Sequence, residues 1–309
     1  MADERGARAA DSPGVPALPG PLVDAGWLRR HSADVAAGRL VLVDVRWYLD
    51  GRSGHDAFLT GHLPGARWVD LDAELSSPAT PTNGRHPLPS PAVFAAAMRR
   101  LGVDDTTPVV AYDDASGSVA ARLWWLLRVH DHPVAVLDGG LGAWPPEGLE
   151  RGAALPVAHL GTFRERPWPE RRFVDADRVD DLRKDLAALV LDARATARYE
   201  QGDLAVDPRR GHVPGARSAP WIANTTDGPG SALRPAAELH DRFVGLGAGE
   251  ARSVVCYCGS GVTACHDLLA LELAGFGDRT ALYPGSWSQW GADITRPAAT
   301  GPDPGPRDR

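Results

Sequence analysis

Residues 254–276 read VVCYCGSGVTACHDLLALELAGF, and this stretch changes its character twice. It begins as a continuous apolar segment of strand length and passes through a turn of small residues at Gly259 and Gly261. It then continues as a helical pattern whose apolar positions include Cys265, Leu268 and Leu269. An apolar strand followed directly by a helix is typical of a central strand in a parallel sheet that is covered on both faces. The stretch therefore predicts an α/β fold.

The chain contains this pattern twice. Residues 108–130 read PVVAYDDASGSVAARLWWLLRVH, and three further segments recur in the same order in both halves. The pairs are LVDVRWYLDG with LVLDARATARY, GHLPGARWVDLD with GHVPGARSAPW, and AVLDGGLGAW with ALYPGSWSQW. Four segments that recur in the same order indicate an internal repeat. We predict two α/β domains, each a mostly parallel sheet flanked by helices, at residues 20–148 and 173–297, with an interdomain linker over residues 149–172 that runs over the surface.

Composition narrows the class of protein. The 309 residues are 43% hydrophobic and 24% charged, as in soluble globular proteins, and the net charge of −7 argues against a nucleic-acid partner. Three cysteines make a disulfide framework unexpected and favour a reducing compartment. The first residues lack the apolar core of a signal peptide, and no apolar run reaches membrane-spanning length. We expect a cytoplasmic protein with no membrane partner, and disordered tails over residues 1–19 and 297–309.

The repeat pairs Asp113 of the first half with Cys258 of the second. A thiol in only one copy suggests that the second copy carries out the chemistry and the first supports it. Cys258 follows a strand and precedes a helix, and Gly259 and Gly261 allow the loop to curl so that its N–H groups point inward. Such a loop and the helix N-terminus lower the pKa of a thiol, and the thiolate is the reactive form. The spacing predicts that Cys258 is a nucleophile.

Two other readings of this stretch are less favoured. A metal site would need Cys256, Cys258, Cys265 and His266, but Cys265 lies two helical turns beyond the loop, so Cys256 and Cys265 are expected in the core and no metal is expected. A phosphatase with a cysteine-based phosphate loop would need an arginine six residues after the cysteine, where this chain has Ala264.

The sequence CGSGVTAC at residues 258–265 resembles the active-site loop of the 3-mercaptopyruvate sulfurtransferases, two-domain members of the rhodanese superfamily. The likeness extends from about Leu22 to Trp290 and includes GHLPGA, GHVPGA, LDGGLGAW and LYPGSWSQW. It implies tandem rhodanese-like domains with the active site at their interface. It also implies a catalytic cysteine in the second domain only, and no cofactor.

The resemblance implies roles for four residues. Cys258 would attack the sulfur of 3-mercaptopyruvate, release pyruvate and hold the sulfur as a persulfide. An acceptor thiol, such as thioredoxin or a small thiol, or cyanide would then take the sulfur. Ser260 would form a Ser-His-Asp arrangement with His86 and Asp72, both from the first domain, for proton transfer. From the residues alone, His86 could equally be a surface-loop histidine and Asp72 could cap a helix.

The substrate carboxylate needs a cation, for which the forked donors of arginine are suited. The resemblance assigns Arg198 to the first such position. The second falls in the loop AVDPRRGHVPG, which is shorter than in the family, so Arg209 is predicted and Arg210 is the alternative. The loop residues expected to contact substrate are Gly259, Gly261, Val262 and Thr263.

The sequence also predicts structural roles for two histidines and leaves two alternative functions open. His62 and His212 of the repeated GH-x-PG segments are expected to be structural. A thiosulfate:cyanide sulfurtransferase is the nearest alternative, but such relatives usually carry basic residues directly after the cysteine, where this chain has Gly259 and Ser260. A non-enzymatic persulfide carrier on the same fold is the second alternative, and it would need neither the histidine nor the arginines.

Overall fold

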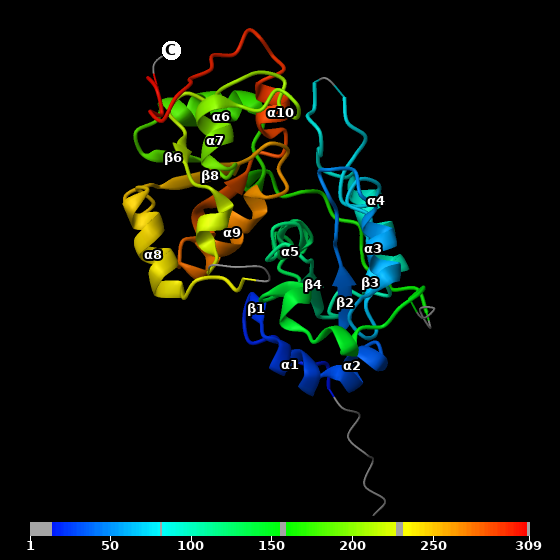
Figure 1. Ribbon diagram of the computed structural model, residues 1–309. Coiled ribbons are helices and arrows are strands. Elements are labelled where there is room, and N and C mark those ends of the chain that lie inside the picture. The colour runs from blue at the N-terminus through cyan, green and yellow to red at the C-terminus, as the bar shows by residue number, and fades with distance from the viewer. Residues whose placement is uncertain (1–13, 81, 155–158, 227–230, 308–309) are drawn as a thin grey trace, which may run out of the picture.

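The computed structural model describes residues 14–80, 82–154, 159–226 and 231–307. Within these ranges the chain forms two lobes, each a parallel sheet with helices on both faces (Figure 1). The predicted fold class is therefore confirmed. Over the described residues, no helix has the length and apolar character needed to cross a membrane.

The first lobe contains a five-stranded sheet in the order β1-β5-β4-β2-β3, and all its pairs are parallel. Its strands are β1 (Leu22–Val23), β2 (Val41–Asp44), β3 (Arg67–Trp68), β4 (Val109–Tyr112) and β5 (Val134–Leu137). Its helices are α1 (Ala25–Arg30), α2 (Ser32–Ala36), α3 (Gly54–Thr60), α4 (Pro91–Arg100) and α5 (Ala120–Arg128). Side chains of α1, α2 and α3 share one apolar cluster, whereas those of α4 and α5 belong to another, which places the two groups on opposite faces of the sheet.

The second lobe repeats this plan with a four-stranded parallel sheet in the order β7-β6-β8-β9. Its strands are β6 (Ala188–Asp192), β7 (Arg217–Ser218), β8 (Ser253–Tyr257) and β9 (Thr280–Leu282). Its helices are α6 (Ala176–Lys184), α7 (Thr196–Gln201), α8 (Ala236–Gly245), α9 (Ala264–Leu273) and α10 (Ser286–Trp290). The apolar runs that predicted central strands are β4 and β8, and each lies between two neighbours.

The repeat extends to individual side chains. Asp44 at the end of β2 holds Arg46, which donates to the carbonyl of Gly61 at 2.7 Å. In the second lobe Asp192 and Arg194 form the same pair, and Arg194 donates to the carbonyl of Gly211 at 2.8 Å. Each buried pair joins the end of a strand to the loop that precedes the next one.

The GH-x-PG histidines also have equivalent places. His62 stacks on Phe58 with ring centroids 3.9 Å apart, and His212 stacks on Tyr199 at 3.7 Å. The Nδ1 atom of each ring lies within hydrogen-bond distance of the backbone carbonyl of its stacking partner. These contacts are structural, as the sequence predicts.

The lobes meet along α5 and α9, which lie side by side between the two sheets (Figure 1). One apolar cluster runs through both helices, so that Trp124 and Trp125 of the first lobe share a core with Leu268 and Leu269 of the second. The helical pattern predicts an apolar stripe on α9, yet residues 264–271 are all buried because the second lobe covers one side of the helix and α5 the other.

Two connecting segments pack more closely than the sequence suggests. The linker places Phe163 in the core at 2% exposure and bonds Gly161 and Phe163 to the backbone of the first lobe, while residues 155–158 lie outside the described ranges. The expected disorder of residues 297–309 is wrong for 297–307. Ala299 pairs with His212 in an isolated bridge, and the amide of Gly215 donates to Pro304. The expected disorder of residues 1–13 concerns a segment outside the described ranges.

A buried polar cluster lies where α9 faces the first lobe. Nε2 of His266 donates to the carbonyl of Ser116 at 3.1 Å, and its Nδ1 faces the Asn224 amide at 3.2 Å, which fits a neutral ring. The same amide donates to Asp267 at 2.6 Å. Burial lowers the pKa of His266 to about 4 and raises the pKa of Asp267 to about 7.

These shifts act on stability with opposite signs. Asp267 titrates higher in the folded than in the unfolded state, so its contribution is complete below about pH 3.8 and is lost as the pH rises to about 7. His266 titrates lower when folded, so its contribution is complete above about pH 6.5 and is lost as the pH falls to about 4. The two effects offset each other in mildly acidic solution.

We predict that Asp267→Asn makes the protein acid-sensitive, because it leaves the histidine uncompensated. Relative to the unmodified chain, the free energy of unfolding should fall by up to about 1.4 kcal/mol per pH unit between pH 7 and pH 4. Denaturant unfolding at four pH values measures this. Asp181→Asn is the control, because that side chain is 71% exposed on α6. Parallel stability curves for the chain and the Asp267 variant would contradict the prediction.

Candidate active site

Cys258 lies at the carboxyl end of β8, at the point where a tight loop leads into α9. Its side chain is buried at 2% exposure, and its Sγ accepts the amide of Gly261 at 3.1 Å. Gly261 has φ 79°, and a Cβ there would lie 2.6 Å from the Pro284 carbonyl oxygen. Only glycine fits both conditions, so this residue fixes the curl of the loop.

The segment around α10 fixes the outer side of this loop. The amide of Cys258 donates to Ser286 Oγ at 3.1 Å, and its carbonyl accepts the amide of Trp287 at 2.9 Å. The carbonyl of Gly259 accepts the amide of Ser288 at 2.9 Å. The loop backbone is therefore held from outside, while its interior faces the sulfur.

The first lobe shows what such a loop binds. The carboxylate of Asp113, at the end of β4, accepts four amides at 2.7–2.8 Å. They belong to residues 115, 117, 119 and 120, and Gly117 has φ 84°, close to that of Gly261. Burial raises the pKa of Asp113, and these amides oppose the rise. The first lobe thus carries an anion cradle filled by its own carboxylate, and the second has a sulfur at the equivalent place.

Ser260, His86 and Asp72 form a hydrogen-bonded chain. Nδ1 of His86 lies 2.8 Å from Ser260 Oγ, and its Nε2 lies 3.0 Å from a carboxylate oxygen of Asp72. Trp47 supports both partners, since its indole N–H donates to Asp72 at 2.9 Å and its ring packs edge-on against the imidazole at 4.9 Å. The three side chains grouped by the resemblance are therefore in contact, and residues 71–76 form turns, so Asp72 caps no helix.

The charge states of His86 and Asp72 follow from their surroundings. Burial lowers the pKa of His86, although the hydrogen bond with Asp72 opposes this, so the imidazole is neutral at pH 7. The same hydrogen bond lowers the pKa of Asp72, whose side chain is 61% exposed and therefore ionised. With Nε2 donating to the carboxylate, Nδ1 is free to accept the proton of Ser260.

A cavity of about 340 Å³ opens over the cysteine between the lobes. The first lobe contributes Trp47, Tyr48 and Arg85 to its lining, and the second contributes Arg198 with Cys258. Of the loop residues predicted to contact substrate, Gly259, Val262 and Thr263 line the cavity, whereas Gly261 serves the curl of the loop. Over the described residues, no group of three or more His, Cys, Asp or Glu side chains is arranged to hold a metal ion.

One of the two predicted arginines lines the cavity and the other does not. Arg198 lines the cavity as expected and is paired with the buried Asp207. Arg209 is absent from the lining, because its guanidinium donates to the carbonyls of Trp290 and Arg296. Arg210 is exposed.

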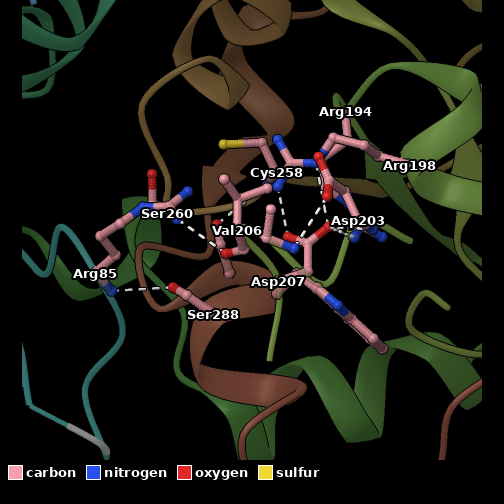
Figure 2. A network of polar contacts seen from close by, with 12 residues as sticks. Arg85, Arg194, Arg198, Asp203, Val206, Asp207, Cys258, Ser260 and Ser288 are labelled. Carbon is pink, nitrogen blue, oxygen red and sulfur yellow. Dashed lines mark hydrogen bonds and ion pairs between the residues drawn. The ribbon is translucent and has the colours of Figure 1, made fainter. Parts of the chain in front are cut away.

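Arg85 lies at the cavity instead, and sequence reasoning missed it (Figure 2). The available signal was its position directly before His86 in the segment GRHPLP.

Comparison with known proteins gives the same result for both lobes. The family model described as a rhodanese-like domain matches residues 24–146 and again residues 175–293. The chain belongs to the rhodanese family. This match covers most of both lobes, including the strand–loop–helix unit of each.

Individual relatives agree with the family assignment. A Pseudomonas aeruginosa protein whose name proposes 3-mercaptopyruvate sulfurtransferase activity is 40% identical over 85% of this chain and 93% of its own length. A Mycobacterium tuberculosis protein whose name proposes thiosulfate sulfurtransferase activity is 38% identical over 84% of this chain and 90% of its own length. The crystal structure of the Escherichia coli 3-mercaptopyruvate sulfurtransferase SseA superposes with a TM-score of 0.71 and 33% identity over 87% of this chain and 99% of that one. This rhodanese-family chain is therefore a sulfurtransferase enzyme.

In this sulfurtransferase another arginine, Arg122 of α5, connects the two lobes at the active site. It is fully buried and donates to the carbonyl of Gly261 in the cysteine loop at 3.0 Å. It also donates to the carbonyls of His86, Pro87 and Leu75 at 3.2–3.4 Å. Burial lowers the pKa of Arg122. One guanidinium thus holds the loops that carry both halves of the site.

We predict that Arg122→Met destabilises the enzyme by about 2–4 kcal/mol, because it leaves several buried carbonyls without donors. Below the unfolding temperature, the rate of Cys258 alkylation by iodoacetamide should also change, because the loop around Gly261 loses its anchor. Denaturant unfolding and alkylation kinetics followed by mass spectrometry measure both effects.

Arg128→Met is the matched control on the same helix. Arg128 is 29% exposed and pairs with Glu272 of α9 at 2.7 Å, so its loss should cost about 1 kcal/mol or less and leave the alkylation rate unchanged. Equal effects of the two substitutions would contradict the special place of Arg122.

Proposed function

We propose that this sulfurtransferase takes sulfur from 3-mercaptopyruvate, holds it as a persulfide on Cys258 and passes it to a thiol or to cyanide, with release of pyruvate. The observation that supports this most is the chain Ser260–His86–Asp72 beside the cysteine. A neutral histidine behind a serine hydroxyl can move a proton at pH 7. A donor that leaves as a carbanion needs such a proton.

In the first half-reaction the Cys258 thiolate attacks the sulfur of the donor. An S–S bond forms, the donor's S–C3 bond breaks, and its electron pair moves to C3 to give the enolate of pyruvate. The proton of the donor thiol then reaches C3. The products are a cysteine persulfide anion and pyruvate, so that atoms, electrons and charge balance.

Ser260 and His86 provide the route for that proton. Nδ1 of His86 takes the proton of the donor thiol through the Ser260 hydroxyl, and the same hydroxyl returns it to C3 of the leaving enolate. Asp72 fixes the tautomer by accepting from Nε2, as a carboxylate does behind a catalytic histidine. The amide of Gly261 donates to the sulfur of Cys258 and stabilises its anionic form.

In the second half-reaction an acceptor attacks the outer sulfur of the persulfide. A thiol leaves with it as a persulfide and cyanide leaves with it as thiocyanate, and either step restores the Cys258 thiolate. The acceptors that we propose are thioredoxin, a small thiol or cyanide. All three cysteines are free, which supports a reducing compartment such as the cytoplasm.

Thiosulfate is the alternative donor, and the arginines that line the cavity, Arg52, Arg85 and Arg198, support binding of an anion of either kind. Parallel steady-state kinetics with 3-mercaptopyruvate and thiosulfate under reducing conditions test the proposal. A higher kcat/KM with thiosulfate than with 3-mercaptopyruvate would make thiosulfate the donor. No turnover with any small thiol or cyanide would favour the non-enzymatic persulfide carrier.

We predict that Cys258→Ser abolishes sulfur transfer, because a hydroxyl is a poor nucleophile toward sulfur and forms no persulfide. Mass spectrometry after treatment with 3-mercaptopyruvate should find one added sulfur atom on Cys258 in the unmodified chain. Cys256→Ser and Cys265→Ser are the controls and should keep transfer, because burial raises the pKa of both thiols and they pack in the core. An added sulfur on Cys256 or Cys265 would sink the assignment.

We predict that Ser260→Ala slows turnover of 3-mercaptopyruvate by about 10²-fold or more, the usual size of a general acid–base contribution. Turnover of thiosulfate should fall much less, because sulfite leaves without a proton. The measurement is the ratio of kcat/KM for the two donors in each variant. A fall of the same size with both donors would mean that the serine only shapes the loop.

A further inference from the structure

We propose that Arg85 of the first lobe and Arg198 of the second form the clamp for the donor's carboxylate, and that Asp207 keeps its net charge near +1, which matches a monoanion. The proposal rests on the function proposed above and names the specificity-determining residues of that site.

Both guanidinium groups converge on the residue next to the cysteine. A Cβ placed on Gly259 would lie 3.0 Å from Nη2 of Arg198 and 3.2 Å from Nη2 of Arg85. Gly259 has no positive φ, so its backbone conformation does not demand glycine, but a side chain there would crowd the two guanidinium groups. Two forks directed at one place beside Cys258 can share the two oxygens of a carboxylate.

Arg85 is fixed in position by the second lobe. Its backbone amide donates to Ser288 Oγ at 3.0 Å, and its Nη1 donates to the carbonyl of Val206 at 3.0 Å (Figure 2). Over the described ranges no carboxylate lies within ion-pair distance of this side chain, and its buried Nε has no hydrogen-bond partner. Burial lowers the pKa of Arg85 and negative charge at Cys258 opposes this, which agrees with its closeness to the sulfur.

Arg198 offers only one edge to the cavity. Its Nε donates to one carboxylate oxygen of Asp207 at 3.1 Å and its Nη2 to the other at 2.5 Å. This pairing uses the side edge of the guanidinium. The end edge, formed by Nη1 and Nη2, faces Gly259, where a Cβ would lie 3.6 Å and 3.0 Å from these atoms.

The ion pairs around the cavity determine the net charge of the clamp. Arg194 pairs with Asp192 at 2.6 Å and also approaches Asp207 at 3.5 Å, so two arginines and two aspartates cancel. Arg52, which also lines the cavity, pairs with Asp50 at 2.9 Å. Arg85 therefore supplies the unbalanced positive charge. A second unbalanced charge would favour a dianion such as thiosulfate, because each added charge attracts a dianion twice as strongly as a monoanion.

The first test is the KM for 3-mercaptopyruvate of Arg85→Ala, which should rise about 10- to 100-fold, as expected for one lost charge-assisted contact. The kcat should change much less, and saturating donor should still load sulfur on Cys258 by mass spectrometry. Arg85→Lys should recover part of the affinity, because an ammonium group keeps the charge but not the fork. Arg217→Ala is the matched control, since Arg217 is a partly buried arginine that donates to a backbone carbonyl away from the cavity.

The second test compares two donors in Asp207→Asn, which keeps the shape of the side chain and removes its charge. The ratio of kcat/KM for thiosulfate to that for 3-mercaptopyruvate should rise about fivefold or more. Thermal unfolding of each variant checks that it is folded. If this variant does not fold, the Arg85 series decides alone.

The outcomes separate this inference from the proposed function. Absence of 3-mercaptopyruvate turnover in the unmodified chain would overturn the function itself. Normal turnover in that chain with an unchanged KM in Arg85→Ala, or a larger effect of Arg209→Ala than of Arg85→Ala, would overturn the clamp and leave the function standing. An unchanged donor ratio in a folded Asp207→Asn would overturn the charge assignment.

Discussion

The buried guanidinium of Arg122 is the interaction on which the active site depends. It comes from the first lobe, yet one of its acceptors is the carbonyl of Gly261 in the cysteine loop of the second, and others belong to the segment that carries His86. A buried charge is costly unless it is hydrogen-bonded, and the Nη1 and Nη2 atoms of Arg122 find acceptors in both lobes although its Nε has none, so the guanidinium holds these loops together. The hydrogen bond between His86 and Ser260 joins the same two loops that this guanidinium contacts.

Each lobe carries the same kind of amide loop, but the loop contacts a different side chain in each. In the first lobe the amides close on the carboxylate of Asp113, which occupies the cradle with a side chain of the chain itself. In the second lobe Cys258 replaces the carboxylate with a single sulfur atom, which accepts the amide of Gly261. The side chain at the first position of the loop thus decides whether the cradle is structural or chemical. The first lobe must then contribute to the site from other segments.

Much of this arrangement could be predicted from the sequence, because a repeat and a continuous apolar strand are local signals. The parallel sheets, the place of Cys258 and the contact of Ser260 with His86 follow from residues 254–263 and the resemblance that they carry. The place of Arg85 in the cavity lining could not be located this way, since Arg85 reaches the cavity only through the packing of one lobe on the other. The order of residues 297–307 was also hidden, because a segment rich in Pro and Gly gives no periodic pattern even when its backbone pairs with Gly215.

The packing of the lobes also explains why one segment of the first lobe carries so much of the site. Gly84 has φ 86°, and a Cβ there would lie 2.6 Å from the carbonyl oxygen of Gly285, so residues 84–86 cross to the second lobe in close backbone contact. Within this crossing Arg85 faces the cavity and His86 faces Ser260. A change in this short loop therefore affects the cavity lining and the contact with Ser260 together, because Arg85 and His86 are adjacent in the chain. The lobe that lacks the cysteine loop thus supplies both part of the cavity lining and the histidine that contacts Ser260.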